Sequence, residues 1–365
     1  MKEISISKYS YDQLSHIDEY IEGDDLQIAS FLTQSVISSY YDNPSNVDKN
    51  NTALLLAKKS NIIVGRYLLL YTKIKKLDGV LRAYSSVSIE VHESMRGKGV
   101  GTSLLETALS LNEVPIFMFS LLSPTYYSMV GKPKYGCTVF NFPELCKLRN
   151  ISSALEVRGI RGLLLKSISI LGNSALWLLD IPNKIRAHKL NNKYIITKEK
   201  VVPDWAGDMC LNDGHKYAEY HDTAWLQWNL THNLSGKKDD VQSFYSIKTK
   251  EDRPIAFFFT KERLIENVGK CKQMLCGVLC EWASIDKELT EADINILAFY
   301  TLSKGCYYMR TVTNDASTVK ALKRRWFISH GNMQMGFKDI DRKHPDMADQ
   351  SLWRIRFGCC NSILF

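Results

Sequence analysis

The sequence predicts a mixed α/β fold of the α+β class, arranged as two domains with a similar order of elements. The chain has 365 residues, which suits two domains of ordinary size better than one. Its hydrophobic content of 45%, charged content of 24% and mean hydropathy of −0.19 describe a globular chain with enough apolar residues for two cores. Short apolar segments typical of strands alternate with helical patterns in both halves.

The first domain, expected over residues 1–150, begins with a strand, two helices and three consecutive antiparallel strands. Those three strands are rich in Val, Ile, Leu and Tyr and are separated by short polar turns. Leucine and alanine recur at helical spacing after Gly101. The expected strands are Lys2–Ser7, Thr52–Lys58, Ile62–Lys73, Leu81–Val91, Pro115–Leu122 and Thr138–Phe140, and the expected helices are Tyr11–Tyr20, Leu26–Tyr40, the one after Gly101 and Pro124–Val130.

A bridging helical segment, 151–190, and a second domain, 191–365, are expected to follow. The bridge contains the apolar stretch Leu163–Leu179, which Lys166 interrupts and which is shorter than a clean span of about 20 apolar residues. We therefore expect a buried or domain-bridging helix and no integral membrane segment. A helix that lies on a membrane surface is the less favoured alternative, because the segment has few basic residues on a polar face. The expected strands of the second domain are Lys193–Lys198, Val241–Ile247, Pro254–Phe259, Met274–Ile285, Cys306–Val312, Gly331–Lys338 and Ser351–Phe357, and its helices are Thr223–Thr231, Glu291–Ser303 and Ser317–Trp326.

A glycine-rich turn between a predicted strand and a predicted helix is the most informative segment. It reads Arg96-Gly97-Lys98-Gly99-Val100-Gly101, and its three glycines remove the side chains that would block a close approach to the backbone. The helix that follows begins with free N–H groups and the positive end of its dipole, and one Arg and one Lys add positive charge. The turn is therefore predicted to bind phosphate, although it matches neither the P-loop nor the GxGxxG dinucleotide pattern.

The spacing Arg96-x-x-Gly99-x-Gly101 resembles the acyl-CoA signature Arg/Gln-x-x-Gly-x-Gly/Ala of the GNAT N-acetyltransferase superfamily. The order of elements over residues 1–140 agrees with that family. The resemblance implies two GNAT-like domains, acetyl-CoA or another acyl-CoA as co-substrate, and no metal. It also implies that backbone amides of the turn hold the pyrophosphate and that the strand edge at Glu90 and Val91 bonds the pantetheine arm. The implied cofactor-binding residues are Val91, Arg96, Gly97, Lys98, Gly99, Val100, Gly101 and Thr102.

A tyrosine that follows the predicted buried strand is the candidate general acid. Tyr127 stands four residues before Gly131, as in the family segment whose tyrosine hydroxyl protonates the departing thiolate. The match is partial, because the usual upstream asparagine is replaced around Ser123 and Lys132 stands where an aromatic residue normally follows the glycine. The adjacent Tyr126 is the alternative acid, and simple packing in the core is the alternative to an acid role.

The base that removes a proton from the acceptor amine is expected next to the cofactor strand. Glu90 is the first candidate and His92 the second. On a strand these two residues point to one face, while Val91 and Glu93 point to the other. Deprotonation through water, without a strong side-chain base, stays open as a third route.

The second half contains no counterpart of the glycine signature. Between Ile285 and Glu291 it carries acidic residues and no glycine, which suits pyrophosphate poorly. We therefore expect this half to complete the acceptor pocket or to pack against the first half. The pair Trp225-x-x-Trp228 resembles a feature of two-domain GNAT-like proteins linked to envelope or polysaccharide modification, and the aromatic core of a helix explains it more simply.

The expected function is transfer of an acyl group, with acetyl as the first candidate, from acyl-CoA to a primary amine of a small molecule or sugar by direct attack in a ternary complex. Two other functions stay open. One is a regulatory protein that binds acyl-CoA without turnover. The other is a paired-GNAT aminoacyl transferase of envelope biosynthesis that uses charged transfer RNA, which the glycine signature argues against because that group usually lacks a CoA turn.

Composition and charge narrow the range of partners. The net charge of +8 favours phosphates, but no nucleic-acid motif accompanies it, so no nucleic acid is expected. The nine cysteines include no CxxC pair and predict reduced thiols without a metal site. Together with an N-terminus that lacks an apolar signal core, they predict a cytoplasmic location. The acceptor and the oligomeric state have no signal in the sequence.

Overall fold

The computed structural model describes residues 4–21, 32–60, 62–121, 123–232 and 240–359. Within these ranges the strands form one mixed 14-stranded sheet with helices packed against it, which confirms the predicted α+β class. The strands are β1 (Ile4–Ser10), β2 (Thr52–Lys59), β3 (Ile62–Lys76), β4 (Gly79–Val91), β5 (Ile116–Ser120), β6 (Thr138–Leu148), β7 (Ile195–Glu199), β8 (Tyr217–Glu219), β9 (Val241–Lys248), β10 (Pro254–Val268), β11 (Cys271–Ser284), β12 (Tyr308–Val312), β13 (Ile328–Asp339) and β14 (Trp353–Arg354).

Several of the described α-helices begin at a residue whose side chain caps them. Ser10 and Gln13 form a capping box at the start of α1, and Thr290 and Asp293 form another at the start of α9. The helices are α1 (Tyr11–Ser15), α2 (Gln34–Tyr41), α3 (Val100–Leu109), α4 (Pro124–Val130), α5 (Ser152–Val157), α6 (Gly162–Lys193), α7 (Asp204–Leu211), α8 (Thr223–Thr231), α9 (Glu291–Thr301) and α10 (Ala316–Arg324).

The three consecutive strands β2, β3 and β4 are antiparallel, as predicted. Strand β3 is buried along most of its length, since strands cover both of its edges and helices cover its faces. Helix α3 lies close to β3 at Gly65, where a Cβ atom would come within 2.9 Å of Val100. The absence of a side chain at this position therefore sets the distance between the strand and the helix.

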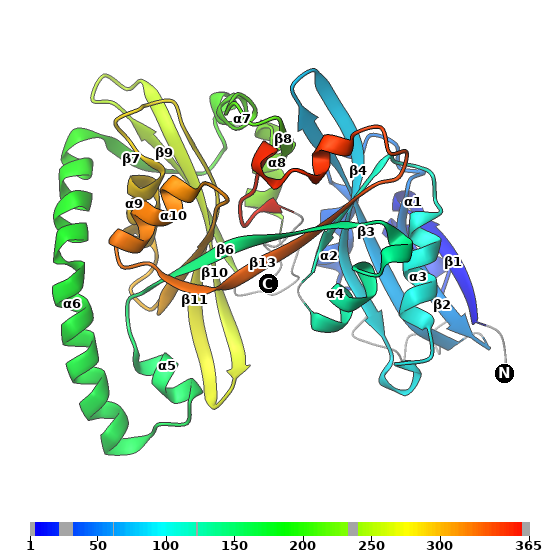
Figure 1. The fold of residues 1–365 in the computed structure, drawn as a ribbon, viewed down its shortest axis with the longest axis horizontal. Coiled ribbons are helices and arrows are strands. Elements are labelled where there is room, and N and C mark those ends of the chain that lie inside the picture. Colours follow the sequence, from blue (N-terminus) through cyan, green and yellow to red (C-terminus); the bar gives the residue numbers. More distant parts are fainter. Residues whose placement is uncertain (1–3, 22–31, 61, 122, 233–239, 360–365) are drawn as a thin grey trace.

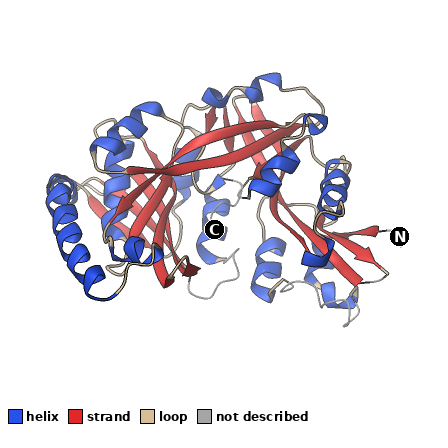
Figure 2. Ribbon diagram, turned by 60° about the horizontal axis from the view of Figure 1, so that its bottom comes forward, coloured by secondary structure: helices blue, strands red, loops and turns tan. Residues whose placement is uncertain are grey.

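The two halves of the chain exchange one strand each. The main path of the sheet runs β1-β2-β3-β4-β5-β13-β6-β12-β11-β10-β9-β7. Strand β13, from the end of the chain, lies between β5 and β6, while β6 pairs with β12 of the second half. Figures 1 and 2 show these two long strands crossing between two groups of strands.

The exchanged strands lie between two similar arrangements. In the first half β4 pairs with β5 in parallel, and in the second half β11 pairs with β12 in parallel. Each parallel pair is preceded by antiparallel strands in sequence order. This repetition agrees with the similar element order expected for the two halves, and the division at 1–150, 151–190 and 191–365 stays a proposal.

Several expected boundaries were wrong. Strand β6 continues to Leu148 instead of ending near Phe140, because it pairs with β12 and β13 from the other half. The first helix ends at Ser15, and of the expected strand Ser351–Phe357 only Trp353–Arg354 is a strand. Helices α5 and α7 and strand β8 were not expected. The expected helix Leu26–Tyr40 lies partly outside the described residues, and its described part is α2.

For Leu163–Leu179 the sequence predicted a buried or domain-bridging helix, and burial was wrong. This stretch belongs to the 32-residue helix α6, which stands at the outer edge of the second half, at the left of Figure 1. Only 6% of its most apolar window is buried inside the protein. Hydropathy alone therefore predicted the wrong environment for α6. The helix packs its polar face against the protein and leaves its apolar face exposed.

Candidate functional site

The gap between β4 and β5 is the first feature of the candidate site. The two strands pair in parallel from Ala83 and Ile116 to Ser86 and Phe119, and within the described residues the edge of β4 that faces β5 has no strand partner beyond that point. A register shift opposite Leu68 and Leu69 makes residue 87 an extra residue of β4. The backbone edge up to Val91 is therefore open to a ligand that bonds like an added strand.

The glycine turn follows the end of β4. Gly97 and Gly99 have φ angles of +76° and +85°, in the left-handed region that glycine adopts without strain. Nothing lies within 4 Å of a Cβ atom placed on either residue, so the turn is open on that side. The Nε atom of Arg96 donates a hydrogen bond to the carbonyl oxygen of Val91 at 3.3 Å. This bond connects the turn to the end of β4.

Helix α3 starts directly at this turn. Gly99 is its N-cap and provides no side-chain oxygen, so it leaves the first amides of the helix without a side-chain cap. The amide of Ser103 is the first one that donates within the helix, to the carbonyl of Gly99 at 2.9 Å. The amides of Val100, Gly101 and Thr102 precede it and have no acceptor in the helix. Unpaired amides at the positive end of a helix can bind phosphate, and the phosphate site predicted from the sequence stays a prediction.

Helix α4 brings two adjacent tyrosines to the same region. Its N-cap Ser123 accepts a hydrogen bond from the amide of Tyr126, and Gly131 ends the helix. The Tyr126 hydroxyl shares hydrogen bonds with those of Tyr67, at 2.8 Å, and Ser86, at 2.5 Å. Burial raises the pKa of Tyr126 well above its usual value. This hydroxyl is therefore committed to the core.

Tyr127 is half-buried and faces a cavity of about 400 Å³. Its hydroxyl makes no hydrogen bond to any of the described residues, so it is available to a ligand. The cavity is lined by residues of α4, β6, β12 and β13 and of the C-terminal segment, namely Leu121, Ser123, Pro124, Tyr127, Ser128, Glu144, Arg310, Asn332, Met333, Gln334 and Phe357. The glycine turn follows the carboxyl end of β4, and the α4 wall of the cavity follows the carboxyl end of β5. Because β4 and β5 are parallel, both features lie at the same edge of the sheet.

A carboxylate–guanidinium pair forms part of the cavity wall. The two nitrogens of Arg310, on β12, bond the two oxygens of Glu144, on β6. The pair raises the pKa of Arg310 against the opposing effect of burial. Sequence analysis missed both residues and the amides of Asn332 and Gln334. The only local signal was a polar residue at each position of otherwise apolar strands, and strand exchange is what gathers them.

The candidate base Glu90 is held by Arg66 on the neighbouring strand. Both bonds, from Nε at 3.1 Å and from Nη2 at 2.8 Å, go to the same oxygen, Oε2. The other oxygen, Oε1, has no partner among the described residues. The second candidate, His92, bonds the hydroxyl of Ser94 through Nδ1 at 2.8 Å. Arg66 therefore orients the Glu90 carboxylate through Oε2, and Oε1 is available to a ligand.

Glu90 and the tyrosines of α4 lie on opposite sides of β4. Ile89 and Val91 both point toward Gly101 of α3, so Glu90 between them points away from that helix. Helix α4 is on the α3 side, since Met129 also lies close to Gly101. None of the contacts of the described residues joins Glu90 to Tyr127. The two predicted catalytic residues, Glu90 and Tyr127, therefore lie on opposite sides of the β4 edge.

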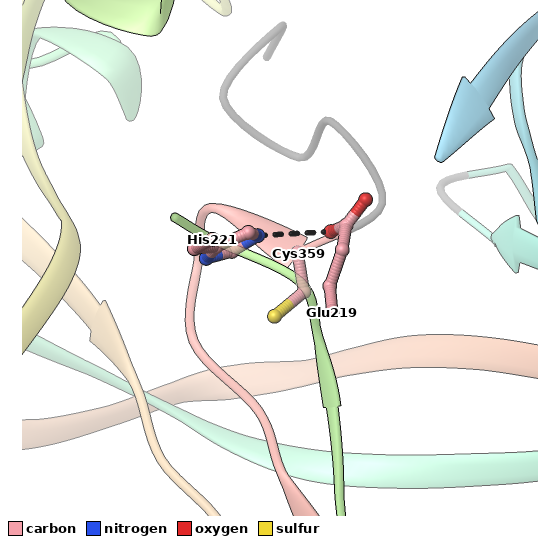
Figure 3. A group of neighbouring side chains, drawn as sticks. All are labelled: Glu219, His221 and Cys359. Atoms are coloured by element: carbon pink, nitrogen blue, oxygen red, sulfur yellow. Dashed lines mark hydrogen bonds and ion pairs between the residues drawn. The ribbon is translucent and has the colours of Figure 1, made fainter. Parts of the chain in front are cut away.

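A second cluster of polar side chains is buried where the halves meet. His221 bonds Glu281 of β11 through Nδ1 at 2.5 Å and Glu219 of β8 through Nε2 at 3.2 Å. Its ring stacks on Trp225, with centroids 3.5 Å apart. Figure 3 shows Glu219 and His221 joined by this hydrogen bond, with Cys359 beside them. Glu219 also accepts from Thr72 of β3, which links the cluster to the first half.

The charges of this cluster compensate one another. Burial alone would lower the pKa of His221. The two neighbouring carboxylates together have the larger effect and raise the pKa above its ordinary value. Burial likewise opposes the charge of Glu281, and Arg354 and His221 outweigh it and lower the pKa of that carboxyl to about 2. The two carboxylates beside its ring nitrogens therefore favour the protonated form of His221.

The ligand atoms of Glu219, His221 and Cys359 all lie within 4.8 Å of one another, as they would in a metal site. However, both ring nitrogens of His221 already bond carboxylates, and a buried guanidinium, that of Arg354, stands 3.6 Å from Glu281. A cation would have to displace a proton and lie near this fixed positive charge. The residues fit an ionic network between the halves better than a metal centre.

Comparison with solved structures identifies the fold. A GCN5-related N-acetyltransferase from Anabaena variabilis aligns with 93% of this chain and 73% of its own, with a TM-score of 0.55 at 9% identity. Saccharomyces cerevisiae N-myristoyltransferase with bound myristoyl-CoA aligns with 93% of this chain and 83% of its own, with a TM-score of 0.56 at 10% identity. A probable N-acyltransferase of unknown function from Enterococcus faecalis aligns over 93% and 73%, with a TM-score of 0.51 at 9% identity.

No protein-family model and no curated protein sequence matches the chain. The resemblance therefore lies in the three-dimensional structure and covers nearly the whole chain. The protein has the GNAT fold, as the glycine signature and the element order predicted.

Proposed function

Given a chain with the GNAT fold, we propose that it is an N-acyltransferase that moves an acyl group from acyl-CoA to a primary amine of a small molecule or sugar, in the cytoplasm. The observation that carries the proposal is the open turn at Gly97 and Gly99, placed at the head of α3 where β4 leaves β5. A phosphate site at this position fits a CoA diphosphate, because the unpaired edge of β4 next to it can bond a pantetheine arm.

The proposed reaction follows from the groups around that edge. The pyrophosphate binds the amides from Gly97 to Gly101, with Lys98, Arg96 and Thr102 adding charge and a hydroxyl. The pantetheine arm runs along β4 toward the gap. The thioester then lies at the strand edge, with Tyr127 on one side and Glu90 on the other. An amide of the strand polarises the carbonyl oxygen.

The acceptor amine attacks the thioester carbon directly, so a C–N bond forms and the C–S bond breaks. Glu90, through its open oxygen or through a water molecule, takes the proton that the amine loses. Tyr127 gives its proton to the departing thiolate and yields CoA thiol. Acetyl-CoA is the first co-substrate to test, and the myristoyl-CoA bound by the yeast relative makes a longer acyl chain the second.

We further propose that the second half completes the acceptor pocket. It supplies Arg310, Asn332 and Gln334 to the cavity in front of Tyr127. These side chains are polar and surround an aromatic hydroxyl, which suits an acceptor that carries several hydroxyl or amino groups. The lack of a glycine signature in the second half agrees with this role, since one cofactor site serves both halves.

Calorimetric titration of the full chain with acetyl-CoA tests the proposal, followed by a screen of amine acceptors for thiol release. Gly99→Ala should raise the dissociation constant at least about tenfold, because alanine at a φ of +85° costs about 1–2 kcal/mol and disturbs the turn. Gly214→Ala is the matched control, since Gly214 has a φ of +83° and equally open surroundings far from the turn in sequence. The proposal fails if millimolar CoA does not bind, or if both variants weaken binding equally.

A further inference from the structure

Helix α6 carries its apolar residues on the outside. The exposed fraction reaches 81% for Leu163 and 74% for Leu171. The exposed large apolar residues on one face are Leu163, Leu164, Ile170, Leu171, Trp177, Leu178 and Ile185. Three neighbouring pairs recur at a spacing of seven and Ile185 continues the spacing, so they form one stripe along the helix. We call this set the α6 stripe, and it is about 33 Å long at 1.5 Å per residue.

The opposite face of α6 is polar and fixes the helix to the second half. Asp180 forms an ion pair with Lys147 at 2.8 Å and accepts a hydrogen bond from the hydroxyl of Tyr300 at 2.6 Å. Asn183 is buried and donates to the carbonyl of Arg325 at 3.1 Å.

Two further polar contacts hold the same face. Asn173 accepts a hydrogen bond from the amide of Ile151, and Arg186 forms two hydrogen bonds with the carboxylate of Asp293, at 2.8 and 2.7 Å. The helix therefore cannot rotate its stripe inward. Nor can it leave the protein to cross a bilayer without breaking buried ion pairs, although its length and composition would allow a span.

The charges around the α6 stripe are almost all positive. From Arg158 to Lys193 the sequence contains seven Lys or Arg residues and one acid, Asp180, which is the residue paired on the inner face. Among the described residues, Arg158, Arg161, Lys166 and Lys189 form no ion pair. Each of these four side chains is exposed.

A tryptophan lies within this basic and apolar surface. Lys184 lies over the ring of Trp177, with its nitrogen 5.0 Å from the ring centroid, and more than half of Trp177 is exposed. Tryptophan beside lysine is typical of residues at the level of lipid headgroups.

We propose that the α6 stripe binds the surface of an anionic phospholipid bilayer, with the helix lying parallel to the membrane plane. The stripe enters the boundary between headgroups and acyl chains, and the lysines and arginines around it contact lipid phosphates. A second copy of the chain is a poorer occupant, because pairing two stripes would bring the unpaired lysines of both copies together. The proposal concerns a surface remote from the acyl-CoA turn and does not depend on the proposed reaction.

Co-sedimentation of the full chain with vesicles tests the proposal. Vesicles of phosphatidylcholine with phosphatidylserine should bind the protein, and binding should weaken as salt rises and on pure phosphatidylcholine. The double variant L171Q/L178Q should lower the partition coefficient at least about tenfold, since two exposed leucines no longer enter the bilayer. The variant K166E/K189E should weaken binding to anionic vesicles only.

The matched control is L77Q/V201Q, which changes two equally exposed apolar residues outside α6 (71% and 68%) and should bind like the unchanged protein. Circular dichroism and sedimentation velocity establish that each variant is folded and report its oligomeric state. The proposal is overturned if anionic vesicles do not bind the protein, or if L171Q/L178Q and the control behave alike. It is equally overturned if the protein is a dimer that L171Q/L178Q dissociates and that vesicles do not bind.

Discussion

Tyr126 and Tyr127 are neighbours on α4, yet the Tyr126 hydroxyl is buried among Tyr67 and Ser86, while Tyr127 lines the cavity and its hydroxyl bonds none of the described residues. The sequence could not choose between them as the acid. The structure favours Tyr127, because a proton donor must be in reach of the thiolate and free of other bonds.

Tyr127→Phe should lower kcat about 10²- to 10⁴-fold and leave the unfolding free energy unchanged, since only the free hydroxyl is lost. Tyr126→Phe should show the opposite pattern, with a loss of about 1–3 kcal/mol of stability because two buried hydroxyls lose a partner. Steady-state kinetics and urea denaturation measure the two effects. Equal kinetic losses in both variants would contradict the assignment.

Glu90→Gln should lower kcat about 10²-fold without changing CoA binding, because the amide keeps the hydrogen-bonding shape but accepts no proton. The control is Glu93→Gln, which alters a nearby exposed acid on the helical turn after the strand. Arg66→Gln should produce a smaller loss than Glu90→Gln, since it removes the group that orients the carboxylate and not the carboxylate itself. Unchanged turnover in Glu90→Gln would leave His92 or water as the route for the proton.

His221→Gln should destabilise the protein by about 3–5 kcal/mol, because it leaves Glu219 and Glu281 buried beside each other without the cation between them. The control His188→Gln changes an exposed histidine of α6 and should have no measurable effect. Urea unfolding monitored by tryptophan fluorescence measures both. A loss below about 1 kcal/mol would mean that the imidazole is neutral in the folded protein.

The same cluster predicts how stability depends on pH. The folded-state pKa of Glu281 is about 2 against an ordinary 4.5, so its contribution is complete above pH 4.5 and is lost as pH falls toward 2. The folded-state pKa of His221 is raised above 6.5, so its contribution is present below pH 6.5 and is lost as pH rises through the raised value. The stability difference between the unchanged protein and His221→Gln should therefore be largest between about pH 4.5 and 6.5. A difference that grows above pH 6.5 would refute the charged imidazole.

Local signals predicted one part of the molecule well. The glycine turn, the helix after it and the three antiparallel strands before it depend on residues close together in sequence, and the structure has all of them. The positive φ angles of Gly97 and Gly99 are a second reason for glycine at these positions, beside the close approach to the backbone that the sequence suggested.

The parts that sequence analysis missed depend on pairing between distant segments. The cavity wall needs Glu144 from β6 beside Arg310 from β12, and no short-range pattern indicates that β6 pairs across the halves. The buried pair of His221 and Glu281 joins β11 to the segment after β8 in the same way. For α6, hydropathy indicated an apolar helix but not the side that it presents to the protein.

The strand exchange constrains when the protein can fold during synthesis. Strand β5 gains its second neighbour from β13 (Ile328–Asp339), which is synthesised long after β5 (Ile116–Ser120). Until then the half that carries the glycine turn has an unpaired sheet edge, which is exposed to wrong pairing or aggregation. A nascent chain halted before residue 328 should therefore need chaperone protection, and the half that carries the glycine turn should acquire its native protease resistance only after β13 has been synthesised.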